Sequence, residues 1–138
     1  IGGGKFTETE LKMIDELGVS GQVSQRDLTD TELEAAYGSA HVFVCTSRYE
    51  GFGLPALEAL NYGCRTILSD APALVEVAAD CADYFRVGDD ANLSSVMTSA
   101  LSEGPDLNPY LELGIRRAEQ FSWMETAKLT AKAYQTLS

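Results

Sequence analysis

Two glutamates bracket a glycine-rich turn near the middle of the chain, and their spacing points to carbohydrate chemistry. In the stretch RYEGFGLPALEAL, seven residues separate Glu50 from Glu58, and Gly51, Gly53 and Pro55 lie between them. A carboxylate suits a vicinal diol, because its two oxygens can accept one proton from each hydroxyl group. The acid pair is therefore predicted to bind sugar hydroxyl groups.

The backbone between the glutamates suits a different chemical group. Pro55 fits the first turn of a helix, so the amides of Gly53 and Leu54 lie near a helix N-terminus that attracts anions. Glycine also lets a phosphate approach the backbone closely. A structural explanation stays open beside this one, since the helix dipole by itself favours Glu58 near a helix start.

Three capping boxes mark helix starts, each with a hydroxyl at the N-cap and a glutamate three residues later. The first helix is expected over 8–17, with Leu11 buried, and the second over 30–37, with Gly38 as its stop and Tyr37 buried. The pairs are Thr7 with Glu10, Thr29 with Glu32, and Ser122 with Glu125.

Short apolar runs over 41–45 and 65–69 are typical of strands covered on both faces, and 82–87 is expected to form a last short strand. Helices are expected between and after these strands, and Asp70 is expected to be the N-cap of a short one. A later helix is expected to have an amphipathic face over 93–101 that ends on Leu101. This alternation predicts an α/β fold, a Rossmann-like parallel sheet with flanking helices. The glycine turn then lies at the carboxyl end of a strand, where open α/β sheets bind ligands.

Composition limits the classes of partner. The chain has 138 residues and a net charge of −11, which argues against binding to nucleic acid. We expect no membrane span or signal peptide. The number of cysteines is odd, which favours reduced thiols in a cytoplasmic protein without a zinc site; they are Cys45, Cys64 and Cys81. The chain opens on Ile1 rather than Met, so we expect it to be cut from a longer protein.

The segments AAYGSAHVFVCTS, YEGFGLPALEA and YGCRTILSDAPALVEV resemble the retaining GT-B-fold glycosyltransferases of family four, group one. Glu50 and Glu58 satisfy the E-x7-E motif of that family. The resemblance implies a C-terminal domain that binds a nucleoside-diphosphate sugar, here truncated at its N-terminal side. It places Glu58 on the ribose diol and Glu50 beside the donor sugar as the catalytic residue.

The same resemblance implies further contacts with the donor. Backbone groups of Gly51, Phe52, Gly53 and Leu54 would hold sugar hydroxyl groups and the diphosphate. The segment GQVSQRDLTDTEL resembles the strand and loop that contact the nucleotide base, which places Val23, Ser24 and Gln25 at the base.

The activity implied is transfer of a hexose, with retention and without a metal or cofactor, to a glycan or glycoconjugate acceptor in polysaccharide biosynthesis. A missing N-terminal domain would carry the acceptor site and any contact with a membrane surface, so the 138-residue chain alone is expected to be inactive. Two alternatives remain: a non-catalytic module that binds a nucleotide or nucleotide sugar, and a flavodoxin-like or receiver-like domain.

Overall fold

The computed structural model describes residues 4–104 and 107–137, and these form two compact units. The first unit extends to Ala35 and the second begins at Ala36, so the boundary falls within a helix. The elements in chain order are α1 (Glu8–Glu16), α2 (Asp30–Ser39), β1 (Phe43–Cys45), α3 (Leu54–Asn61), β2 (Thr66–Ser69), α4 (Pro72–Ala78), β3 (Asp83–Phe85), α5 (Asp90–Ser102), α6 (Leu111–Glu119) and α7 (Trp123–Leu137).

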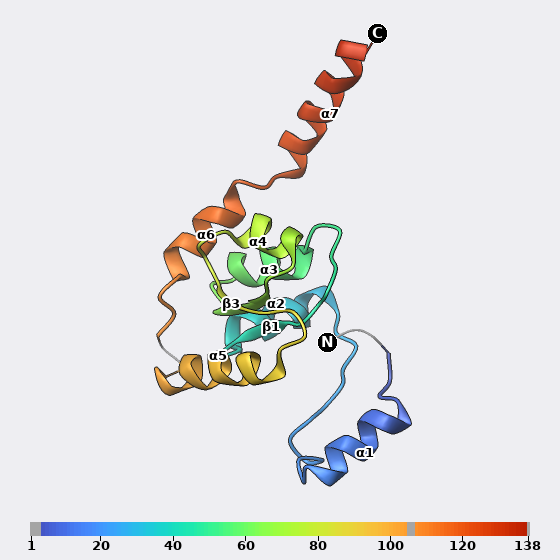
Figure 1. Ribbon diagram of the computed structural model, residues 1–138. Helices are drawn as coiled ribbons and strands as arrows, with labels where there is room; N and C mark the ends of the chain where they lie inside the picture. The colour runs from blue at the N-terminus through green and yellow to red at the C-terminus, as the bar shows by residue number, and fades with distance from the viewer. Residues whose placement is uncertain (1–3, 105–106, 138) are drawn as a thin grey trace. The chain divides into compact units, whose positions relative to one another are not determined.

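The second unit is built on a parallel sheet with strand order β1-β2-β3 (Figure 1). Val44 pairs with Ile67 and Leu68 pairs with Tyr84 in the two parallel ladders. β2 is the central strand, and all of its residues are buried. The predicted α/β fold with a parallel sheet is therefore confirmed.

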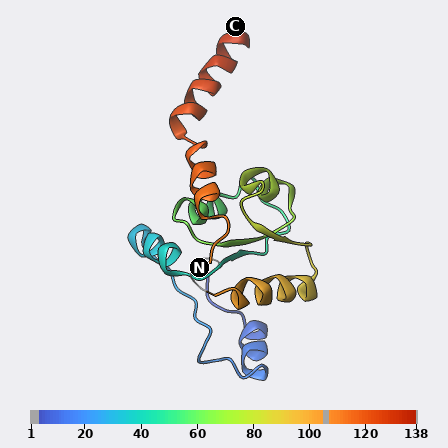
Figure 2. The ribbon, with the colours of Figure 1, turned by 90° about the vertical axis from the view of Figure 1, so that its left-hand side faces the viewer.

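Helices cover the two faces of this sheet, with α3 and α4 on one face and α5 on the other (Figures 1 and 2). Successive residues of a strand point to opposite faces, so Leu68 packs with Leu60 and Leu74 while Ile67 packs with Phe85 and Ala100. Both Ile67 and Leu68 are completely buried. The apolar run predicted as a strand covered on both faces is thus correct for β2, whereas β1, an outer strand, is only half-buried.

An ion-pair network joins elements at the start of the strands. The Arg65 side chain is 6 % exposed, and its guanidinium donates to Asp83 and Glu103, each over 2.9 Å. It also donates to the carbonyl oxygen of Ala100. Arg65 therefore connects the start of β2 to β3 and α5.

The predicted helix starts are confirmed at all three capping boxes, although one box is incomplete. Thr7 with Glu10 and Thr29 with Glu32 make reciprocal hydrogen bonds. At α7 the Ser122 hydroxyl accepts from the Glu125 amide over 3.1 Å, and the Glu125 carboxylate pairs instead with Lys128.

Several expectations about helix ends and burial were wrong. Gly38 lies inside α2, which continues to Ser39, because helical bonding extends through it and Ala40 still donates to Ala36. Leu11 is 52 % exposed on α1, of which no residue is buried, and Leu101 of α5 is 55 % exposed. An amphipathic pattern shows which face can be buried, but a partner element must be present to bury it.

Candidate functional site

The loops that follow the three strands are held together at the carboxyl edge of the sheet. The Ser69 hydroxyl, at the end of β2, donates to the carbonyl oxygen of Ser47 in the loop after β1. The Val87 amide, after β3, donates to Asp70 Oδ1 over 2.8 Å. Asp70 is therefore not the N-cap of α4, as the sequence had suggested, because its carboxylate faces the loop after β3 and Ala71 takes the cap position.

Gly53 sets the shape of the turn that leads into α3. It is the N-cap residue, and its φ of 96° and ψ of 40° lie in the left-handed region. A Cβ atom at this position would lie 2.8 Å from Leu74 Cδ2, closer than real side chains approach. The backbone conformation therefore favours glycine here, and a Cβ would also force the Leu74 side chain of α4 to shift.

The start of α3 offers amide donors that nothing in the described chain occupies. No hydrogen bond within the described residues uses the N–H groups of Phe52, Gly53 or Leu54. Pro55 has no N–H, and the Ala56 amide already donates to the Gly53 carbonyl over 3.0 Å. Unpaired amides at the positive end of a helix can bind an anion.

A cationic side chain lies at the same edge of the sheet. Arg48 is exposed in the loop after β1, and its guanidinium lies over Gly88 in the loop after β3, where a Cβ would be 3.5 Å from Arg48 Nη2. Its positive charge adds to the attraction that the helix terminus exerts on an anion.

The two glutamates of the motif have different surroundings. Glu50 is half-buried in the loop before the glycine turn, and among the described residues no hydrogen bond or ion pair involves its carboxylate. Glu58 lies on α3 with an exposed side chain, and its Oε2 accepts from the Tyr37 hydroxyl over 3.3 Å. Glu58 thus lies about one turn after Leu54, near the helix start as the sequence indicated.

Tyr37 was foreseen only as a buried residue of α2, and its hydroxyl contact was missed. The side chain is 6 % exposed. Burial and the negative charge of Glu58 raise the pKa of Tyr37 to about 12. The signal available in the sequence was the tyrosine itself, because a buried tyrosine needs a partner for its hydroxyl group.

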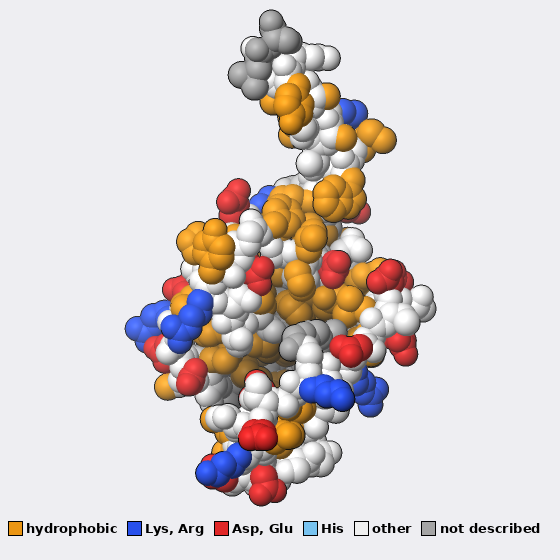
Figure 3. All heavy atoms as spheres, turned by 90° about the vertical axis from the view of Figure 1, so that its right-hand side faces the viewer, with side chains coloured by type: hydrophobic (Ala, Val, Ile, Leu, Met, Phe, Trp, Pro, Cys, Tyr) orange, Lys and Arg blue, Asp and Glu red, His pale blue; other side chains and the backbone are white. Residues whose placement is uncertain are grey.

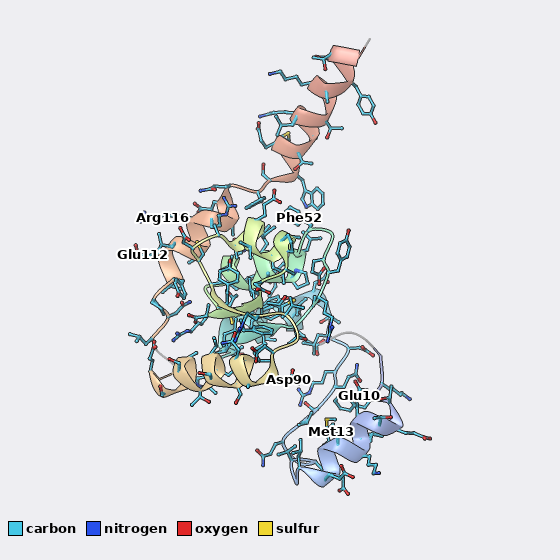
Figure 4. All side chains as sticks on the ribbon, viewed as in Figure 1. Glu10, Met13, Phe52, Asp90, Glu112 and Arg116 are labelled. Atoms are coloured by element: carbon cyan, nitrogen blue, oxygen red, sulfur yellow. The ribbon has the colours of Figure 1, made fainter. Side chains whose placement is uncertain are left out.

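An apolar hollow of about 270 Å³ lies beside the glycine turn. The ring of Phe52 meets that of Phe121 edge-on at 5.6 Å between centroids, and Figure 4 shows Phe52 close to the end of α6 and the start of α7. Hydrophobic side chains gather at the base of α7 in the space-filling view (Figure 3). Neither Glu50 nor Glu58 is among the residues that line the hollow, which are Phe52, Leu54, Leu57, Phe121, Ser122, Trp123 and Thr126.

The residues proposed for base recognition, Val23, Ser24 and Gln25, belong to the first unit. The strand expected there is wrong: all three have irregular backbone, since their amides and carbonyls do not pair with another strand. The Gln25 side chain donates to Asp27 over 3.1 Å. Their role at the base stays a prediction.

Side chains capable of metal binding are scattered. Within residues 4–104 and 107–137, His, Cys, Asp and Glu form no group of three that could hold a metal ion. The thiols of Cys45, Cys64 and Cys81 are free, and burial raises the pKa of Cys64 and Cys81. None of the described helices combines the length and the hydropathy that a bilayer-spanning segment needs.

Comparison with known proteins gives consistent matches over most of the chain. The model of the family described as glycosyl transferases group 1 matches residues 1–110. An MMP alpha-(1->4)-mannosyltransferase of Mycolicibacterium hassiacum is 39 % identical over 129 residues, which is 90 % of this chain and 31 % of that protein. O-antigen chain mannosyltransferase B of Escherichia coli is 33 % identical over 108 residues, 78 % of this chain and 28 % of that protein.

A solved structure of sucrose-phosphate synthase from Thermosynechococcus elongatus superposes with a TM-score of 0.77 at 27 % sequence identity. The match covers 91 % of this chain and 33 % of that one. The chain thus spans about a third of the length of these known proteins.

Proposed function

The chain belongs to the glycosyl transferases group 1 family, and on this basis we propose that it is the donor-binding part of a retaining glycosyltransferase. The donor is a nucleoside-diphosphate sugar. The acceptor is a glycan or glycoconjugate, and the rest of the protein supplies its binding site. Among hexoses we favour mannose, since two of the relatives are named mannosyltransferases.

The observation that carries this proposal is the start of α3. The amides of Phe52, Gly53 and Leu54 are unpaired within the described residues at a helix terminus, and the exposed Arg48 lies at the same edge of the sheet. These donors suit the diphosphate, which becomes more negative as the bond to the sugar breaks. Groups oriented in advance toward developing charge lower the barrier to transfer.

The two carboxylates divide the remaining tasks. Glu58 accepts hydrogen bonds from the ribose hydroxyl groups, because it follows the phosphate-binding amides by about one helical turn. Glu50 stands before the turn without a partner among the described residues, and it supports the oxocarbenium-like centre of the donor sugar. The proposed reaction retains the anomeric configuration and uses neither a metal nor a cofactor.

We also propose a cytoplasmic location for the protein. The three free thiols support a reducing compartment, since disulfides form mainly in oxidising ones. We expect the 138-residue chain to bind donor poorly and to transfer nothing when separated from the remainder of its protein.

The test is calorimetric titration of UDP, GDP and ADP into the full-length protein, followed by transfer assays with the corresponding sugars. Glu58→Gln should weaken binding of the preferred nucleotide by about ten- to a hundredfold, because hydrogen bonds to a charged group are lost. Glu50→Gln should lower kcat and change affinity little. Glu112→Gln, on the exposed surface of α6, is the matched control and should change neither the nucleotide affinity nor kcat.

The outcomes separate the alternatives. Failure of all three nucleotides to bind the wild-type protein would overturn the proposal. Tight binding without transfer or hydrolysis would favour a non-catalytic nucleotide-binding module. Unchanged affinity in Glu58→Gln would remove the ribose contact and leave only the phosphate site.

A further inference from the structure

The Tyr37 side chain is held rigidly beneath α3. Its ring stacks on Tyr62 with centroids 6.1 Å apart and an interplanar angle of 11°. It meets Phe43 of β1 edge-on at 5.6 Å. With 6 % of its surface exposed and two aromatic neighbours, the ring has little room to change rotamer.

This rigid ring presents its hydroxyl to one carboxylate oxygen of the motif. Tyr37 OH donates to Glu58 Oε2 over 3.3 Å, linking α2 to α3 across 21 residues of sequence. The pKa of Tyr37, about 12, keeps the hydroxyl protonated at neutral pH, so it serves as a donor throughout the working range. Glu58 itself is exposed and would otherwise exchange among several rotamers.

We propose that Tyr37 is a positioning residue for nucleotide recognition: its hydroxyl holds one oxygen of Glu58 and thereby aims the carboxylate at the ribose hydroxyl groups. This inference rests on the proposed function, because it assumes that Glu58 binds ribose. The hydrogen bond fixes the side chain before the ligand arrives, so less conformational entropy is lost on binding. The bond uses one acceptor site of Oε2, so Oε1 and the second lone pair of Oε2 can each still accept from a ribose hydroxyl group.

The perturbation is Tyr37→Phe in the full-length protein. This change removes the hydroxyl and keeps the ring that contacts Tyr62 and Phe43. We expect binding of the preferred nucleoside diphosphate to weaken by about three- to tenfold, which corresponds to the net free-energy contribution of one hydrogen bond. In transfer assays the KM for the donor should rise by a similar factor while kcat stays the same.

The decisive readout compares the nucleoside diphosphate with its 2′,3′-dideoxy counterpart, which lacks the hydroxyl groups that Glu58 would bind. Tyr37→Phe should weaken binding of the ribonucleotide and leave the affinity for the dideoxy nucleotide unchanged. A general loss of structure would weaken both. In a Glu58→Gln background, adding Tyr37→Phe should have no further effect on either ligand.

A matched control removes a tyrosine–carboxylate hydrogen bond elsewhere in the fold. Tyr110 OH donates to Asp83 Oδ1 over 3.1 Å at the opposite edge of the sheet, near the start of β3. Tyr110→Phe should leave nucleotide affinity unchanged. Melting temperatures of both variants should show that each remains folded at the temperature of the titration.

The inference and the proposed function fail in different ways. If Glu58→Gln removes the preference for ribonucleotide and Tyr37→Phe does not change it, the inference is overturned and the proposed function survives. If Glu58→Gln leaves that preference intact, the ribose contact and the inference are both overturned. Equal weakening of both nucleotides by Tyr37→Phe would also overturn it, since the effect would then be structural.

Discussion

Replacing Gly53 by alanine tests whether the shape of the glycine turn is imposed by the tertiary structure. Gly53 has a φ of 96°, a conformation that an alanine adopts at a cost. The added Cβ would lie 2.8 Å from Leu74 Cδ2, and Leu74 is completely buried in the core. Leu74 must therefore move within close-packed surroundings, or the turn must open.

The size of the effect follows from these two costs. Placing a residue with a Cβ in the left-handed region costs roughly 1–2 kcal/mol. Overpacking a core site costs typically about 1–3 kcal/mol, and alanine returns about 0.4–1 kcal/mol by restricting the unfolded chain. We expect Gly53→Ala to lower the free energy of unfolding by about 2–3 kcal/mol.

The assay is urea denaturation followed by circular dichroism, with Gly51→Ala as the matched control. Gly51 lies in the same turn, but a Cβ built there meets nothing within 4 Å and its φ is not positive. Gly51→Ala should therefore change the free energy of unfolding by less than about 0.5 kcal/mol. Gly53→Ala should also weaken nucleotide binding in the full-length protein, since the amides at the start of α3 are displaced with the turn.

Equal unfolding free energies for Gly53→Ala and Gly51→Ala would refute this reasoning. A double-mutant cycle with Leu74→Ala separates the two costs. If contact with Leu74 contributes, the cost of Gly53→Ala should be smaller in the Leu74→Ala background. An unchanged cost would assign the whole effect to backbone conformation.

Three further changes test other parts of the structure. Thr66→Val should raise the free energy of unfolding by about 1 kcal/mol, because the Thr66 hydroxyl is buried without a partner among the described residues; a lower value in urea titration would contradict this. Arg65→Met should lower that free energy by about 2–4 kcal/mol, since it leaves Asp83 without its guanidinium partner; an unchanged urea midpoint would show that the network adds nothing. The pKa of Tyr37 and of Tyr84 is raised to about 12, in each case first by burial, so the stability that protonated tyrosine contributes should be complete below about pH 10 and lost between pH 10 and 12. Tyrosinate absorbance and urea midpoints measured from about pH 10 to 12 check whether stability falls as the tyrosines lose their protons. Tyr37→Phe should lose less stability than the wild type over that range.

Local signals were sufficient for much of the fold. The capping boxes at Thr7 and Thr29 were recognised because both partners lie within four residues of each other. The apolar run that became β2 was recognised because a central parallel strand is buried on both faces. The E-x7-E spacing likewise identified the turn after β1 as the candidate site.

Long-range partners could not be inferred in the same way. Nothing near Tyr37 indicates that its hydroxyl meets Glu58, and nothing near Arg65 indicates Asp83 or Glu103. The burial expected for Leu11 failed for the same reason, because the helical pattern describes a face and says nothing of what covers it.

The amino-acid sequence alone thus determined where most helices begin, which apolar runs form the strands of the parallel sheet, and which turn carries the acidic motif. These properties depend on hydrogen bonds and side-chain periodicity within a few residues. Only the tertiary structure decided that Leu74 lies against Gly53 and that the Tyr37 hydroxyl contacts Glu58. Both contacts join helices that become neighbours only after they pack around the sheet, and close packing then leaves a single arrangement for the side chains.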